Sequence, residues 1–156
     1  MKKNLILAML LAMVIESCAI SVSSETKEAI VPSKNYITKK VKVDDFNAIS
    51  TSTSIDVVYT QTTGDTEVEI YAPDNLMEYV KVKVDGGMLK VSFQSKEKSK
   101  GINIKGKHET EVRVSAPAIH SLQASSSGDI ILKNGLQYAG EVSLKSSSSG
   151  DIKGGK

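Results

Sequence analysis

The sequence contains a single cysteine, Cys18, which lies close to the N-terminus. Residues 25–156 therefore contain no thiol, and a disulfide framework is excluded for that part of the chain. An exported protein without disulfides must be held together by burial of apolar side chains and by backbone pairing. About 130 residues are enough for one domain with its own core.

Aromatic residues, arginine and histidine are also scarce. Tryptophan is absent and there are two phenylalanines, so the stacking platforms typical of sugar-binding modules are few. Arg113 is the sole arginine, whereas a lyase acting on acidic sugars usually needs several basic residues. His108 and His120 have no further histidine or cysteine at the spacing of a metal site. The sequence thus predicts no cofactor and no bound metal.

The charge of residues 25–156 is nearly balanced. Without Lys2, Lys3 and Glu16, the 20 basic and 18 acidic residues fall to 18 and 17, a net charge of +1. This balance does not indicate a nucleic-acid partner. A group of lysines within residues 90–107 is suited to anionic glycans or lipid headgroups, but a solvated loop is the interpretation we favour.

The one long apolar run, residues 5–15, follows Lys2 and Lys3. Eleven residues rise only about 16 Å as a helix, well short of the roughly 30 Å hydrocarbon core of a bilayer. We therefore expect residues 1–24 to be a signal peptide rather than a membrane span.

Two cleavage routes are open for this signal peptide. The stretch "VIESC" at 14–18 resembles the lipobox of bacterial lipoproteins, which makes Cys18 the expected lipidation site. Glu16 departs from that pattern, and cleavage after Ser24 is the alternative. Either route exports the protein. Ala19 allows an outer-membrane lipoprotein or a cell-surface location, and the alternative is a periplasmic or secreted protein.

The rest of the chain alternates between apolar and polar residues. Residues 25–40 are polar, include Pro32 and predict a flexible tether. From Val41 onward, alternation predicts β-strands, and "VKVDGGMLKV" at 82–91 predicts an antiparallel hairpin. A short stretch at 74–80 is the one helical candidate. The predicted strands are 41–43, 55–59, 67–71, 80–84, 89–93 and 111–115.

One short pattern is repeated. "SLQASSSGDI" at 121–130 recurs as "SLKSSSSGDI" at 143–152, and "ISTSTSIDV" at 49–57 is an earlier copy without the glycine. The spacing of 22 residues suits one coil of a parallel β-solenoid, whereas a serine-rich linker is the alternative. We expect the last two copies to pair in parallel, with the second outermost. The residues expected to serve structural roles at the turns are Asp56, Gly128, Asp129, Gly150 and Asp151.

The repeated aspartates raise one catalytic hypothesis. On adjacent coils, Asp129 and Asp151 would have backbones about 4.8 Å apart, and their carboxylates could act as a retaining glycosidase pair. The interpretation we favour is that each aspartate hydrogen-bonds its own turn. We therefore assign no catalytic residue.

Four stretches carry a resemblance to a known family: "VDDFNAIS" at 43–50, "GGMLKVSF" at 86–93, "GIN" at 101–103 and both "SSGDI" words. In this order they resemble the head GIN domain family of "putative auto-transporter adhesins", which are exported or lipid-anchored bacterial proteins. The resemblance covers roughly residues 40–156. It implies a β-helix-like fold, similar to pectin lyases without their catalytic residues, and a role in adhesion.

These observations together predict an all-β protein. Residues 41–156 are expected to form a right-handed parallel β-helix-like solenoid with some antiparallel hairpins, truncated so that its C-terminal coils are incomplete. We expect a non-enzymatic, adhesin-like or structural surface module. The alternative is a polysaccharide-active lyase or glycosidase-like enzyme, which requires a groove with clustered carboxylates and basic residues. The expected partners are an unidentified glycan or a matrix or envelope protein, the membrane through a lipid anchor, and an oligomer through the open C-terminal edge.

Overall fold

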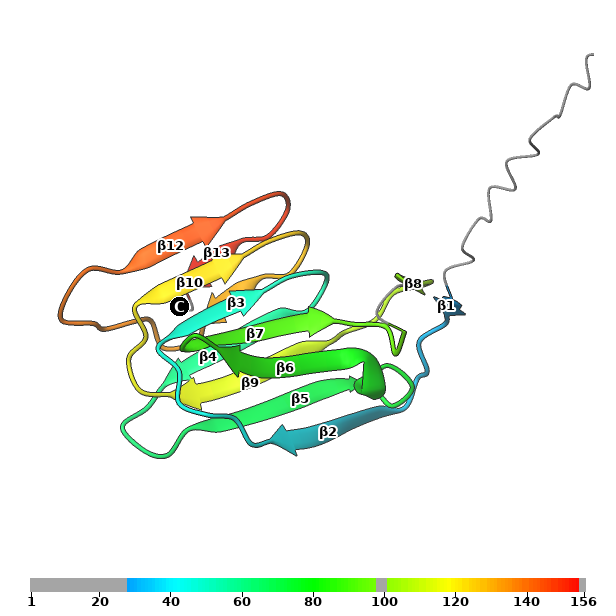
Figure 1. The fold of residues 1–156 in the computed structure, drawn as a ribbon, viewed down its shortest axis with the longest axis horizontal. Coiled ribbons are helices and arrows are strands. Elements are labelled where there is room, and N and C mark those ends of the chain that lie inside the picture. Colours follow the sequence, from blue (N-terminus) through cyan, green and yellow to red (C-terminus); the bar gives the residue numbers. More distant parts are fainter. Residues whose placement is uncertain (1–27, 98–100, 155–156) are drawn as a thin grey trace, which may run out of the picture.

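The computed structural model describes residues 28–97 and 101–154, which form thirteen strands and one 3-10 helix (Figure 1). No helix among them is long and apolar enough to cross a membrane. The elements are β1 (Glu28–Ile30), β2 (Tyr36–Val41), β3 (Ala48–Thr51), β4 (Asp56–Gln61), β5 (Glu67–Pro73), η1 (Met77–Tyr79), β6 (Val80–Asp85), β7 (Met88–Phe93), β8 (Ile102–Ile104), β9 (Glu111–Ala116), β10 (Ser121–Ala124), β11 (Ile130–Leu132), β12 (Ser143–Ser146) and β13 (Ile152–Gly154).

The strands of the described residues form three sheets. A two-stranded sheet pairs β1 with β8. A five-stranded sheet has the order β12-β10-β3-β7-β6, and a six-stranded sheet has the order β13-β11-β4-β9-β5-β2. The two large sheets form the two layers of the molecule (Figure 1), and their buried side chains make one hydrophobic core.

Alternation along the strands explains which side chains enter this core. Val57 and Tyr59 of β4 are fully buried, as are Val112 and Val114 of β9, while the residues between them face outward. The hydroxyl of Tyr59 donates a hydrogen bond to the carbonyl oxygen of Pro117 at 2.8 Å, and burial raises the pKa of this tyrosine to about 12. The strands predicted from alternation after residue 55 are confirmed.

The predicted hairpin is also confirmed. Strands β6 and β7 pair antiparallel, with Asp85 opposite Met88. Gly86 and Gly87 form the turn with φ values of 59° and 75°, a left-handed conformation that glycine adopts without steric cost. The helical candidate at 74–80 is a single turn of 3-10 helix.

The predicted right-handed parallel β-helix-like solenoid is wrong. The strands lie in three separate sheets, and both large sheets are mixed. In the five-stranded sheet β6 pairs antiparallel with β7, and in the six-stranded sheet β5 pairs antiparallel with both β9 and β2. A solenoid stacks each coil on the next coil along the chain. Here the coil of β3 and β4 stacks on that of β10 and β11, although β5 to β9 intervene between them in the chain. The repeat specifies how its own copies pair, whereas the intervening segment adds strands of both orientations.

The predicted tether also needs correction, because ordered structure begins before Val41. Strand β1 pairs parallel with β8, which contains Ile102 and Asn103 of the "GIN" stretch. Strand β2 pairs antiparallel with β5 over its whole length. The prediction missed β2 because this strand is polar. It lies at the edge of its sheet, where exposed lysines are common.

The copies of the repeat pair in parallel, as predicted. Leu122 of β10 lies opposite Leu144 of β12 on one side and opposite Ile49 of β3 on the other. In the second sheet, Ile130 lies opposite Ile152 and Val57. Within the described residues, β12 and β13 are the outermost strands of their sheets, so the expectation that the last copy lies at the edge is confirmed.

Candidate functional site

The turns of the three copies lie one above another and form what we call the turn ladder, residues 51–56, 124–129 and 146–151. The backbone N–H of Ser127 donates to the carbonyl of Thr53 at 3.1 Å, and that of Ser149 donates to Ser126 at 2.8 Å. Thr53, Ser126 and Ser148 occupy the same place in each turn and have φ values of 69°, 62° and 60°. The same strained conformation recurs because the turns hydrogen-bond to one another in register.

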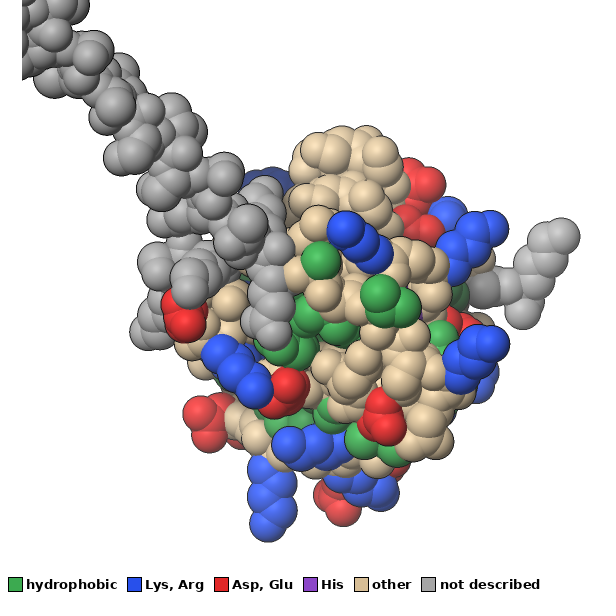
Figure 2. All heavy atoms as spheres, turned by 90° about the vertical axis from the view of Figure 1, so that its right-hand side faces the viewer, with side chains coloured by type: hydrophobic (Ala, Val, Ile, Leu, Met, Phe, Trp, Pro, Cys, Tyr) green, Lys and Arg blue, Asp and Glu red, His purple; other side chains and the backbone are tan. Residues whose placement is uncertain are grey.

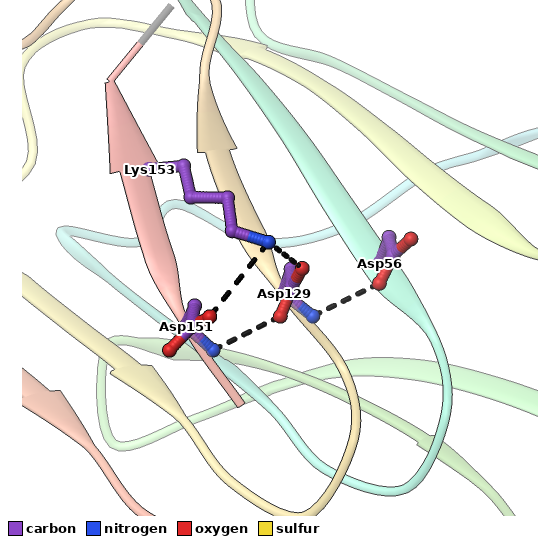
Figure 3. Close-up of polar contacts among 4 residues, drawn as sticks. All are labelled: Asp56, Asp129, Asp151 and Lys153. Carbon is purple, nitrogen blue, oxygen red and sulfur yellow. Dashed lines mark hydrogen bonds and ion pairs between the residues drawn. The ribbon is translucent and has the colours of Figure 1, made fainter. Parts of the chain in front are cut away.

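The aspartates of the turn ladder connect neighbouring turns (Figure 3). The backbone N–H of Asp129 donates to Oδ1 of Asp56 at 2.9 Å, and that of Asp151 donates to Oδ1 of Asp129 at 3.0 Å. Lys153 Nζ donates to Oδ2 of Asp129 at 2.5 Å and lies 3.7 Å from Oδ2 of Asp151. The carboxylates of Asp56 and Asp129 thus each accept a hydrogen bond from the backbone of the copy that follows.

This arrangement does not suit Asp129 to acid catalysis. The hydrogen bond from Lys153 holds the pKa of Asp129 below its usual range, and the same bond raises the pKa of Lys153. A general acid in a glycosidase needs a raised pKa so that it carries a proton near neutrality. Asp129 therefore contributes to the stacking of the turns, because its carboxylate binds the following copy rather than its own turn, as the sequence interpretation had it.

Two positions of the turn ladder require glycine because there is no room for a Cβ atom. A Cβ atom on Gly128 would lie 2.4 Å from the carbonyl oxygen of Ile55, and one on Gly150 would lie 2.8 Å from the carbonyl oxygen of Gly128. Both glycines are buried. Neighbouring backbones approach each other closely at these two positions, and only glycine leaves room for that contact.

The histidines do not form a metal site. His108 lies edge-on to Phe93, its Nδ1 is 3.0 Å from Oγ1 of Thr110, and burial lowers its pKa. His120 lies near Tyr138. Among residues 28–97 and 101–154, no group of three or more His, Cys, Asp or Glu side chains could hold a metal ion. Cys18, the expected lipidation site, lies outside the described residues.

The lysine group at 90–107 does not form one patch in the described part of the chain. Lys90 Nζ is 2.7 Å from Asp85, and Lys96 Nζ is 2.8 Å from Glu78. On the face shown in Figure 2, which is turned by 90° from the view of Figure 1, basic and acidic side chains are interspersed. Lys98 and Lys100 lie outside the described residues.

A shallow hollow of about 440 Å³ on the outer face of the six-stranded sheet has a composition suited to ligand binding. We call it the Arg113 hollow. It contains two carboxylates and two basic side chains from different strands or loops. Its lining residues are Val58, Thr60, Glu69, Glu111, Arg113, Val114, Ser115 and Lys133.

Arg113 is held in place within this hollow. Its Nε donates to Oε1 of Glu111 at 2.5 Å, and its guanidinium carbon lies 4.7 Å from the centroid of the Tyr71 ring. Tyr71 in turn stacks on Tyr36, with ring centroids 5.2 Å apart and an interplanar angle of 23°. Cation–π contact and the carboxylate together fix the plane of the guanidinium, which prepares it for planar polar ligands.

Sequence reasoning singled out Arg113 only as the sole arginine and missed the two tyrosines. Tyr71 follows Glu67 and Glu69 on the outer face of β5, so alternation alone could have placed it outward. Its contact with Arg113 depends on β9 pairing with β5, and its contact with Tyr36 depends on β2 pairing with β5. Neither pairing is visible in the local sequence.

Several solved structures are similar to this chain. A putative adhesin from Bacteroides fragilis has 30% sequence identity and a TM-score of 0.69, with 80% of this chain and 55% of that chain covered. A putative adhesin from Parabacteroides merdae has 23% identity and a TM-score of 0.59, covering 80% and 57%. A putative lipid binding protein from Parabacteroides distasonis has 19% identity and a TM-score of 0.61, covering 81% and 55%. The last two likenesses concern the fold alone.

This chain therefore spans little more than half the length of the similar structures. Among curated proteins, none matches it.

Residues 45–155 match the family described as "Putative auto-transporter adhesin, head GIN domain". That match extends over most of the described structure and includes the turn ladder and the Arg113 hollow. The resemblance carried by the sequence stretches is confirmed, and the chain belongs to this head GIN domain family.

Proposed function

We propose that this protein is a non-enzymatic, exported, adhesin-like module that binds an extracellular glycan or a matrix or envelope protein through the Arg113 hollow. Membership of the adhesin family supports a surface role. The single observation that carries the binding site is the guanidinium of Arg113 held between Tyr71 and Glu111 beside the hollow. Such a fixed guanidinium presents paired donors to carboxylate, sulfate or vicinal hydroxyl groups.

The surrounding residues are consistent with recognition of a ligand that carries both donors and acceptors. Glu69 lies opposite Arg113 in the neighbouring strand, and Lys133 adds a second cation at the rim. The guanidinium is partly exposed, with 46% of the Arg113 side chain accessible to solvent. A ligand can thus reach it without rearrangement of the sheet.

We expect Arg113→Ala to weaken ligand binding about tenfold or more, because a hydrogen bond to a charged group contributes about 1.5 to 3 kcal/mol. A glycan array and a panel of matrix proteins, probed with the chain from Glu25 onward, would first identify a ligand. Titration of the variants against that ligand would then measure the loss.

Two matched variants separate the site from general charge effects. Arg113→Lys keeps the charge but loses the planar fork, so it should bind more weakly than the wild type. Lys83→Ala removes a cation from β6, in the other large sheet, and should bind normally. If Arg113→Ala and Lys83→Ala reduce binding equally, the Arg113 hollow is not the ligand site.

A polysaccharide-active enzyme is the second candidate, because the Arg113 hollow brings together the carboxylates of Glu69 and Glu111 with basic side chains. Under our proposal these carboxylates orient Arg113 and bind the ligand without catalysing a reaction on it. Release of reducing ends or unsaturated sugars from polysaccharides, abolished by Glu111→Gln, would favour the enzyme instead.

We further propose that Cys18 anchors the protein in the outer membrane through an attached lipid. Labelled palmitate should then enter the wild-type protein and be absent from Cys18→Ser, because that variant lacks the sulfur that forms the thioether. Incorporation that persists in Cys18→Ser would contradict the anchor, as would a mature N-terminus at Glu25. A mature N-terminus at Glu25 would leave a secreted or periplasmic protein.

A further inference from the structure

A second polar hollow lies where β4 and β11 end. We call it the amide hollow. It has a volume of about 450 Å³, and its lining residues are Gln61, Thr62, Thr63, Asn134 and Gln137. All five side chains are uncharged and carry a hydroxyl or an amide group. Strands β4 and β11 are interior strands of the six-stranded sheet, each flanked by a strand on both sides. The amide hollow is thus built on the interior of the sheet.

Two amide side chains hold the walls of this hollow together. Asn134 pairs with the backbone of Gln61: its Oδ1 accepts a hydrogen bond from the N–H at 2.9 Å, and its Nδ2 donates to the carbonyl oxygen at 2.9 Å. The Gln61 side chain pairs in the same way with the backbone of Gln137, at 2.8 Å to the N–H and 3.0 Å to the carbonyl oxygen. These bonds fix the loop after β11 against the end of β4, so the hollow is formed before a ligand binds.

The groups that line the hollow retain hydrogen-bonding capacity. A primary amide has two N–H donors and two acceptor lone pairs, and Gln61 and Asn134 each use one donor and one lone pair in these bonds. Within the described residues, the exposed side chains of Gln137 and Thr63 make no hydrogen bond. Donors and acceptors without charge complement neutral groups that both donate and accept, such as the hydroxyl and acetamido groups of sugars.

The amide hollow adjoins the Arg113 hollow. Thr60 and Lys133 line the Arg113 hollow. The residue that follows each of them, Gln61 or Asn134, lines the amide hollow. Along β4, Gln61 comes three residues after the position opposite Arg113, which corresponds to about 10 Å of strand. Consecutive units of one oligosaccharide can therefore occupy both hollows.

We propose that the amide hollow is a second subsite for the same glycan, and that it takes an uncharged sugar unit next to an acidic one. The acidic unit pairs with Arg113, and its neutral neighbour exchanges hydrogen bonds with Gln137 and Thr63. The ligand class is then a heteropolysaccharide in which acidic and neutral sugars alternate, rather than an acidic homopolymer. This inference rests on the glycan form of the proposed function.

Two hexasaccharides serve as probes. One alternates glucuronic acid with N-acetylglucosamine, and the other contains galacturonic acid alone. Isothermal titration calorimetry measures the binding of both to the chain from Glu25 onward. We expect Gln137→Ala and Thr63→Val each to weaken binding of the alternating probe about two- to tenfold, the range for one lost neutral hydrogen bond. Binding of the homopolymer should not change.

The fold should be unaffected by Gln137→Ala, because Gln61 bonds to the backbone of Gln137 and not to its side chain. An unchanged melting temperature checks this. Gln94→Ala is the matched control, since Gln94 is an exposed glutamine that follows β7 in the other large sheet. It should bind both probes as the wild type does.

The outcomes distinguish this subsite from the proposed function. If both probes bind and Arg113→Ala weakens both, while Gln137→Ala and Thr63→Val weaken neither, the Arg113 hollow stands and the amide hollow is refuted. Equal effects of Gln94→Ala and Gln137→Ala would refute it as well. If neither probe binds, the glycan form of the proposed function fails, and the second subsite fails with it.

Discussion

Gly128→Ala should lower the stability of the protein by about 3 kcal/mol, at the upper end of the range for an overpacked core. The new Cβ atom would lie 2.4 Å from the carbonyl oxygen of Ile55, a separation that no side-chain movement can relieve. That carbonyl also accepts a hydrogen bond from the hydroxyl of Thr51 at 2.7 Å, so the turn cannot move away without losing it. In a domain of this size, the melting temperature should fall by about 10 °C.

Gly154→Ala is the matched control. Within the described residues and apart from its chain neighbours, no atom lies within 4 Å of a Cβ placed on Gly154, so the same substitution should change the melting temperature little. Thermal melts followed by circular dichroism compare the two variants. Equal melting temperatures for both would show that the turns of the ladder are not closely stacked in solution.

Leu122→Asp should prevent folding altogether. Leu122 is fully buried between Ile49 and Leu144, on an interior strand of the five-stranded sheet. An unpaired carboxylate at this position costs several kcal/mol, which is comparable to the total stability of about 5 to 15 kcal/mol of a typical domain. We expect a chain without cooperative unfolding and with far-ultraviolet circular dichroism typical of a disordered polypeptide.

Lys133→Asp provides the comparison for this change. It places the same carboxylate eleven residues away at an exposed position, where water solvates the charge. Its urea unfolding midpoint should therefore stay close to that of the wild type. A folded, cooperative Leu122→Asp would contradict the interior position of β10 and would favour a serine-rich linker over residues 121–149.

Local sequence was sufficient for the features that depend on neighbours along the chain. Alternating side chains predict β4 to β7 and β9, because a strand that covers a core must place every second residue inward. Asp85, Gly86 and Gly87 predict the hairpin, because the turn needs left-handed residues. The spacing of 22 residues predicts which residues of β10 and β12 lie opposite each other.

The candidate site was predicted only in part. Repetition singled out Gly128, Asp129 and Asp151, and the structure brings the two aspartates into one hydrogen-bonded row. Nothing near Asp129 in the sequence indicates that Lys153 would bond to it, because that contact depends on how the last copy stacks. The tyrosines beside Arg113 were missed for the same reason.

The sequence by itself therefore determined strands β4 to β7 and β9, the hairpin, the parallel pairing of the repeated copies and the family. Only the tertiary structure decided that the strands form separate mixed sheets, that β2 belongs to the fold, and that Tyr36, Tyr71 and Arg113 meet. The physical reason is that side-chain periodicity specifies which face of a strand is buried. It does not specify the strand's neighbour, which is chosen by competition among all strands for backbone hydrogen bonds and core contacts.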